Sequence, residues 1–240
     1  MMQIETRHVP SFGVARCLLT GGEQLKVEAG AMMMASANIH LEAKMEGGLK
    51  KSLKRSMLGG ESFYVSTFTA PAEGGFVDVA AKLPGDMKVI QMDGLINWIV
   101  EGGNWIASEQ SVTVDSKWKG MKSMAGGEGG FMLQCTGHGQ MIIASYGAIE
   151  EVTLQPGQDI IIDSGHVLAF QESVQWELTR AVAGKSMQSA KSGEGLVYRF
   201  SGPGTIMTQT RNQSQLLGWI RAAVGGSGSG GLNFGLGSRE

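Results

Sequence analysis

Apolar and polar residues alternate with a period of two at three places along the chain. Residues 39–46 alternate strictly, residues 112–115 repeat the pattern, and residues 174–179 show it again. A basic residue closes each stretch: Lys44, Lys117 and Arg180. A period of two predicts a strand with one buried face, so each stretch is predicted to be such a strand.

Further strands are predicted from short apolar runs that lie between turn residues. Many short strands joined by tight turns indicate an all-β fold. Two stretches have helical spacing instead: residues 48–58, and Ser214–Val224 near the end of the chain. The predicted strands are Gln24–Glu28, Phe63–Phe68, Phe76–Ala80, Met87–Met92, Asn97–Val100, Phe131–Cys135, Met141–Tyr146, Asp159–Asp163, His166–Phe170, Leu196–Phe200 and Thr205–Thr210.

Three similar segments follow one another along the chain. A Gly-Glu pair leads into an apolar run at Glu61, Glu128 and Glu194, which are 67 and 66 residues apart. A fixed period of this size predicts one structural element used three times. We expect a single triplicated β domain over residues 1–224, with repeats at approximately 22–95, 96–160 and 161–212. The Gly/Ser-rich tail 225–240 follows it.

Insertions are predicted at one point of each repeat, at residues 47–59, 118–126 and 181–192, because the segment length varies there. Basic residues alternate with Met and Leu in these segments. Such a surface can bind a membrane or an acidic protein partner, but it can equally be a solvated loop whose apolar residues cover the sandwich edge. The residues concerned are Lys50, Lys51, Lys54, Arg55, Lys117, Lys119 and Lys122.

Charge and composition narrow the function classes. The 240 residues carry a net charge of −2, which gives no electrostatic reason to expect nucleic-acid binding. Two cysteines in a chain of this length imply no disulfide framework. The N-terminus has no signal-peptide pattern, and no apolar stretch is long enough to span a membrane. We therefore expect a cytoplasmic protein, with a peripheral membrane location as the alternative.

Candidate chemistry is sparse. The four histidines lack metal-ligand spacing, so no metal, other cofactor or catalytic set is expected. One motif stands apart, because His166 follows Asp163 closely in Asp-Ser-Gly-His. Asp163 could orient the imidazole at a ligand site, or it could be a turn aspartate before a strand, with His166 as an ordinary polar residue.

Six segments together resemble the TRAP-like family, named after the tryptophan RNA-binding attenuation protein. The resemblance runs from about residue 3 to 223 and implies a triplicated β-sandwich, a short variant of the double-stranded β-helix, often assembling as a trimer. The family also includes a mitochondrial inner-membrane protein tied to cristae organisation. It supplies no catalytic residues, and its RNA contacts have no repeated counterpart here. The segments are 28–32, 59–63, 83–86, 163–169, 200–204 and 209–211.

The sequence therefore predicts an all-β protein of three fused β-sandwich repeats, with short insertions and a C-terminal helix. Its expected role is a non-catalytic oligomeric scaffold or binding module, with a homotrimer favoured over a twofold dimer. Two alternatives stay open. One is a peripheral membrane adaptor that uses the basic segments, and the other is a small-ligand-binding protein or enzyme with a site near His166.

Overall fold

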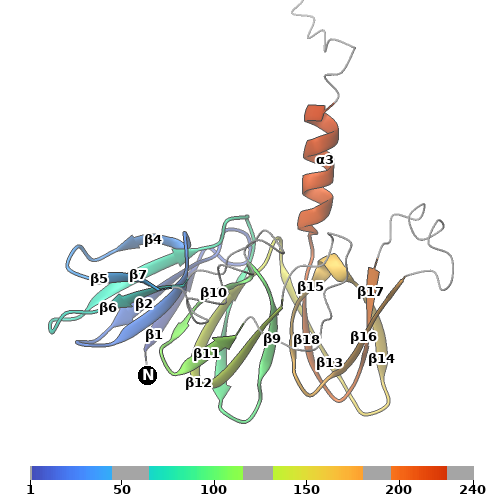
Figure 1. The fold of residues 1–240 in the computed structure, drawn as a ribbon, viewed down its shortest axis with the longest axis horizontal. Coiled ribbons are helices and arrows are strands. Elements are labelled where there is room, and N and C mark those ends of the chain that lie inside the picture. Colours follow the sequence, from blue (N-terminus) through green and yellow to red (C-terminus); the bar gives the residue numbers. More distant parts are fainter. Residues whose placement is uncertain (1, 45–64, 116–131, 181–195, 226–240) are drawn as a thin grey trace, which may run out of the picture.

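The fold is a row of three β-sandwich units, followed by one helix that rises from the third (Figure 1). The first and third units have six strands each, and the second has five because one long strand takes two places. The computed structural model describes residues 2–44, 65–115, 132–180 and 196–225. All strands pair antiparallel, apart from one isolated parallel bridge, and the C-terminal helix is present. The expected fold class is therefore confirmed.

The strands follow one another in the same order in each unit. The first unit contains β2 (Val14–Leu19), β3 (Gln24–Glu28), β4 (Met32–Ala35), β5 (His40–Lys44), β6 (Val65–Thr69) and β7 (Gly75–Ala80), with β1 (Gln3–Arg7) before it. The second contains β8 (Met87–Asp93), β9 (Trp98–Glu101), β10 (Trp105–Glu109), β11 (Val112–Asp115) and the long β12 (Met132–Ala144). The third contains β13 (Ile149–Leu154), β14 (Asp159–Asp163), the 3-10 turn η1 (Ser164–His166), β15 (Val167–Gln171), β16 (Gln175–Arg180), β17 (Leu196–Ser201) and β18 (Gly204–Gln209); α3 (Gln213–Gly225) ends the described chain.

Each unit is a sandwich of two three-stranded layers. In the first unit β2-β7-β4 form one layer and β3-β6-β5 the other. In the third unit the corresponding layers are β13-β18-β15 and β14-β17-β16. In the second unit β12 serves both layers, because its first half pairs with β9 and β11 and its second half with β8 and β10.

A β ladder joins each unit to the next. β10 of the second unit pairs with β3 of the first, and β15 of the third pairs with β9 of the second. The register is equivalent at both junctions, since Ala107 opposes Val27 and Ala169 opposes Val100. Each of β10 and β15 has a bulge just before this residue. The row is thus one continuous structure built by a repeated junction.

The apolar core follows the same plan. Three buried clusters are present, and each includes side chains from a neighbouring unit. Ile106 and Ile142 of the second unit belong to the first cluster, and Ile99 of the second unit belongs to the third. Because burial of apolar area is the main favourable term in folding, the junctions and the units are stabilised together.

Most strand predictions are confirmed, and the bounds of β3 and β14 agree with those expected. The stretches 131–135 and 141–146 were expected as two strands, but one strand, β12, covers most of both and bends where Gly137 and Gly139 have positive φ. The expected repeat ranges start one strand too late, because the Gly-Glu spacing gives a period but not its starting point. The Gly-Glu pairs, the insertions and the helix expected at 48–58 lie outside the described residues.

The first of the alternating strands, β5, departs from the prediction of a buried apolar face. Leu41 is 50% exposed, whereas Val114 at the equivalent position of the second unit is buried and Trp176 in the third is half-buried. β5 lies at the end of the row, where no further unit covers it (Figure 1). The alternation gave the correct strand but could not show what its apolar face contacts.

A buried carboxylate ties three strands of the first unit together. Asp78 is fully buried and accepts hydrogen bonds from Arg16 Nε and Nη2 at 2.8 and 2.9 Å and from Arg7 Nη2 at 2.6 Å. Burial would raise the pKa of Asp78, but the hydrogen bonds and charges of Arg16 and Arg7 outweigh it, so this pKa is lowered. The carboxylate therefore stays ionised in the folded protein at neutral pH.

Replacing the carboxylate should destabilise the fold. We expect Asp78→Asn to lower the free energy of unfolding by about 2–3 kcal/mol, because hydrogen bonds to a charged group are lost inside the sheet. Urea denaturation at pH 7 measures this change. The matched control is Asp159→Asn, because that carboxylate is on the surface beside Arg199 and should change stability by less than about 1 kcal/mol. Equal effects of the two variants would contradict the interpretation.

Candidate functional site

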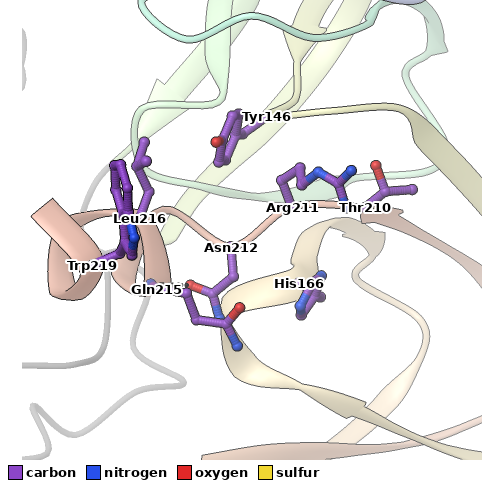
Figure 2. Close-up of a pocket in the computed structure, with 8 residues that line it drawn as sticks. All are labelled: Tyr146, His166, Thr210, Arg211, Asn212, Gln215, Leu216 and Trp219. Carbon is purple, nitrogen blue, oxygen red and sulfur yellow. Dashed lines mark hydrogen bonds between the residues drawn. The ribbon is translucent and has the colours of Figure 1, made fainter.

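A hollow of about 250 Å³ lies at the base of α3 (Figure 2). Its lining comes from the end of β12, the η1 turn, the residues after β18 and the first turns of α3. Polar side chains form one part of the lining and apolar side chains of α3 the other. The residues used below are Tyr146, His166, Arg211, Asn212, Leu216 and Trp219.

Asp163 holds the turn that carries His166. Its Oδ1 atom accepts a hydrogen bond from the Gly165 backbone N–H at 3.0 Å and from Asn212 Nδ2 at 3.2 Å. Asp163 therefore caps η1 and attaches that turn to the segment before α3. These contacts fit the interpretation of Asp163 as a turn aspartate. They do not include a hydrogen bond from Asp163 to the His166 imidazole.

The orientation of His166 is fixed by Gln209 instead. Nδ1 of His166 lies 2.7 Å from the Gln209 carbonyl oxygen, which can only accept, so Nδ1 carries the hydrogen. In the neutral ring, Nε2 is then the free acceptor. The Gln209 side chain donates to the Gly165 carbonyl oxygen at 3.2 Å and accepts from the Tyr146 backbone N–H at 3.0 Å. Gln209 thus connects the turn with the second unit.

Sequence reasoning missed this polar cluster. Gln209 accepts a further hydrogen bond from buried Asn104 at 3.3 Å, and neither residue was among the predicted site residues. A signal was present in the repeat. The positions that correspond to Gln209 in the first two units are Ala80 and Ala144, at the ends of β7 and β12. Two units have alanine at this position and the third has a buried amide, which indicates that the third unit makes hydrogen bonds there that the other two do not.

Asn212 joins the hollow to the helix. Its Oδ1 accepts hydrogen bonds from the backbone N–H groups of Ser214 at 2.9 Å and Gln215 at 3.2 Å, as an N-cap residue does. Its Nδ2 donates to Asp163 Oδ1 at the same time. One side chain therefore caps α3 and fixes the base of the helix to η1.

The hollow combines polar and apolar groups. Arg211, the Tyr146 hydroxyl and His166 offer polar groups, while Leu216 and Trp219 offer apolar surface (Figure 2). Arg211 is exposed, and its charged head favours anionic groups such as phosphate or carboxylate. Among the described residues, no group of three His, Cys, Asp or Glu side chains could hold a metal ion.

Two further titratable side chains, Glu101 and Tyr198, interact inside the row. Removal of water by the surrounding protein raises the pKa of Glu101, at the end of β9, to about 8. Burial, and then the charge of Glu101, raise the pKa of Tyr198 to about 12. Glu101 and Asp163 occupy equivalent positions at the ends of β9 and β14, yet Asp163 is hydrogen-bonded to Asn212 and Gly165.

The other predicted site residues cannot be placed. Lys50, Lys51, Lys54, Arg55, Lys117, Lys119 and Lys122 all lie outside the described residues, so their role stays a prediction. The strands that flank two of these segments can be placed, since Lys44 pairs with Val65 and Met132 with Glu101. In the part of the chain that the structure describes, no helix is long and apolar enough to cross a membrane.

Comparison with known proteins agrees with the fold. The family model described as mitochondrial biogenesis AIM24 matches residues 4–211. An uncharacterised protein of Streptococcus pyogenes serotype M6 is 28% identical over 211 residues, which are 85% of this chain and 83% of that protein. The crystal structure of a Streptococcus pyogenes protein is similar with a TM-score of 0.77 and 25% identity, covering 93% of this chain and all of that one.

The contact between η1 and α3 can be tested with two glycine variants. In Gly165→Ala the new Cβ would overlap the Asn212 amide, so Asn212 should leave its place and the α3 cap should weaken by about 1 kcal/mol. Gly218→Ala, inside α3 with open space around it, should strengthen the helix by up to about 1 kcal/mol. Amide hydrogen exchange across α3 measures both. Equal protection in the two variants would show that Asn212 does not hold the helix.

The raised pKa of Glu101 predicts a pH dependence of stability. The folded pKa of about 8 lies above the ordinary glutamate value near ~4.3, so the folded state keeps its proton longer than the unfolded state does. Stability should therefore fall as pH rises from about 5 to about 8. Denaturation of Glu101→Gln over this range should show a flatter profile than the wild type. The prediction is wrong if both profiles have the same slope.

Proposed function

We propose that this chain, which belongs to the family described as mitochondrial biogenesis AIM24, is a non-catalytic scaffold that assembles head to tail from copies of itself. The observation that carries the proposal is the repeated junction. Each junction pairs the second strand of one unit, β3 or β9, with the third strand of the next, β10 or β15. Among the described strands, β14 is the second strand of the third unit and β4 is the third strand of the first unit. Neither has a partner unit within the row.

Burial supports this assignment. The strands β10 and β15, which have junction partners, are buried along nearly their whole length, whereas β4 is exposed. Met34 is 42% exposed, while the equivalent residues Ala107 and Ala169 are fully buried. Ile161 of β14 is 68% exposed, while its equivalent Ile99 of β9 is fully buried. Both strands thus present apolar surface where the other units are covered.

The register of the proposed contact follows from the junctions inside the chain. β4 carries a bulge between Met32 and Met34, at the place where β10 and β15 carry theirs. Met34 therefore corresponds to Ala107, and Ile162 corresponds to Val27. If the junction is repeated between copies, Met34 opposes Ile162, Ala35 opposes Ile161 and Ser36 opposes Ile160.

Assembly of this kind should form a closed ring. A head-to-tail contact between copies closes when its rotation divides a full turn, and closure leaves no edge strand free. We favour a homotrimer, a ring of nine units, as the TRAP-like resemblance implies, and a cytoplasmic location. A twofold dimer is the alternative. It would pair β4 with β4, or β14 with β14, and leave the other edge open.

Mixing two single-cysteine variants tests the direction of assembly. Ala35→Cys and Ile161→Cys should form a disulfide only when the two proteins are mixed, because opposed residues in an antiparallel ladder have Cα atoms ~4.5–5.5 Å apart. The native Cys17 and Cys135 are buried and should not interfere. The control is Ala35→Cys mixed with Leu95→Cys, because Leu95 is even more exposed than Ile161 but lies elsewhere. Self-linked dimers of one variant would indicate the twofold arrangement.

Light scattering tests the number of copies. The wild type should have a mass about three times the 25.4 kDa of one chain. Ile161→Asp should lower the mass to one chain with little change in the circular dichroism spectrum, because Ile161 is 68% exposed within its own chain. A wild-type monomer in dilute solution would defeat the proposal.

A further inference from the structure

The helix α3 has an apolar face that the described chain leaves uncovered. Leu217 is 50% exposed, Trp219 69%, Ile220 40% and Val224 71%. The helix stands clear of the row of sandwiches (Figure 1). It therefore does not lie across the chain's own sheet. An isolated helix of 13 residues is marginal in water, so contact with another surface would stabilise it.

The apolar residues are arranged as on a helix that binds a surface. At 100° per residue, Leu216, Leu217, Trp219, Ile220 and Val224 fall within an arc of about 160°. Gln215, Gly218 and Arg221 lie on the other side. With 13 residues, α3 is roughly 20 Å long, which is less than the ~30 Å hydrocarbon core of a bilayer. Such a helix can lie at a membrane surface but cannot cross it.

Charge identifies the kind of surface. Between Thr205 and Gly225 the chain contains no Asp or Glu, and its two charged residues are Arg211 and Arg221. Arg211 belongs to the hollow at the base of the helix, together with the Tyr146 hydroxyl. A guanidinium and a hydroxyl beside an apolar wall suit a phosphate group whose attached chains continue over the apolar face. An exposed tryptophan is typical of the membrane interface.

We propose that α3 and the hollow at its base form a docking surface for membranes that contain acidic phospholipid. The apolar arc, with Trp219 at its edge, enters the interface, and Arg211 and Arg221 contact lipid phosphate groups. The surface differs from the basic lysine segments, and it does not depend on the edges β4 and β14. It goes beyond the scaffold role, because it gives the assembly a place to attach.

Vesicle sedimentation of the full chain tests the proposal. The probes are vesicles of phosphatidylcholine with phosphatidylglycerol, and of phosphatidylcholine alone. We expect the wild type to bind the acidic vesicles about tenfold more strongly than the neutral ones. Binding should fall as salt is raised, because the Debye length shortens from ~10 Å at 0.1 M to ~3 Å at 1 M. Absence of wild-type binding to acidic vesicles would overturn the proposal.

Two variants separate the apolar and the charged parts. Leu217→Gln with Trp219→Gln should lower binding to acidic vesicles at least about tenfold, since two exposed apolar side chains can no longer be buried. Arg211→Gln with Arg221→Gln should remove the preference for acidic over neutral vesicles. The matched control is Leu95→Gln, an exposed apolar residue on the β8–β9 turn, which should bind like the wild type. Unchanged binding of the Leu217/Trp219 variant would refute the proposal.

Two further measurements keep this proposal distinct from self-assembly. Trp219 fluorescence should move to shorter wavelength with acidic vesicles, and the shift should disappear in Trp219→Phe. Loss of assembly in Ile161→Asp lowers the number of helices per particle and so weakens binding. Ile161→Asp should nevertheless bind acidic vesicles more strongly than a triple variant that also carries Leu217→Gln and Trp219→Gln. If the Leu217/Trp219 variant instead lowers the mass measured by light scattering, α3 is a contact between copies and the membrane proposal fails.

Discussion

The backbone hydrogen bonds at the junctions are the constraint on which the rest of this structure depends. A strand at the edge of a sheet has unpaired N–H and C=O groups that must find a partner or water. Inside the chain, β3 and β9 receive that partner from the following unit, through β10 and β15. The core clusters, the burial of β10 and β15 and the shape of the row all follow from this repeated ladder.

The same constraint explains why the two ends of the row differ from its middle. A strand with a partner unit buries both faces, so small or apolar residues such as Ala107 and Ala169 suffice there. β4 has Met34 at the corresponding place, and methionine is flexible enough to adapt to a partner surface. Proteins that must avoid edge pairing usually place charged residues or proline at such edges, and β4 has neither between Met32 and Ala35. Its composition thus favours pairing with a further strand.

The junction between the second and third units contains a cluster of buried amide side chains that has no counterpart among the described residues of the first junction. Asn104, Gln209 and His166 form a hydrogen-bonded cluster, and Asp163 and Asn212 continue it to the base of α3. A buried amide stabilises one arrangement because its polar atoms need particular partners. This cluster therefore fixes where α3 begins, and it places Arg211 beside the apolar side of the helix.

The sequence by itself determined most of the strands, the threefold repetition and the C-terminal helix, because these depend on local periodicity. It did not predict β1, β2, β4, β10 and β13. The alternation around Leu41 and the turns at regular spacing carry that information directly. Only the tertiary structure decided where each unit begins, which apolar faces are covered, and that Gln209 rather than Asp163 orients His166. Those properties depend on contacts between residues far apart in the chain, such as Gln209 with Asn104, and no local pattern records which distant strand lies opposite.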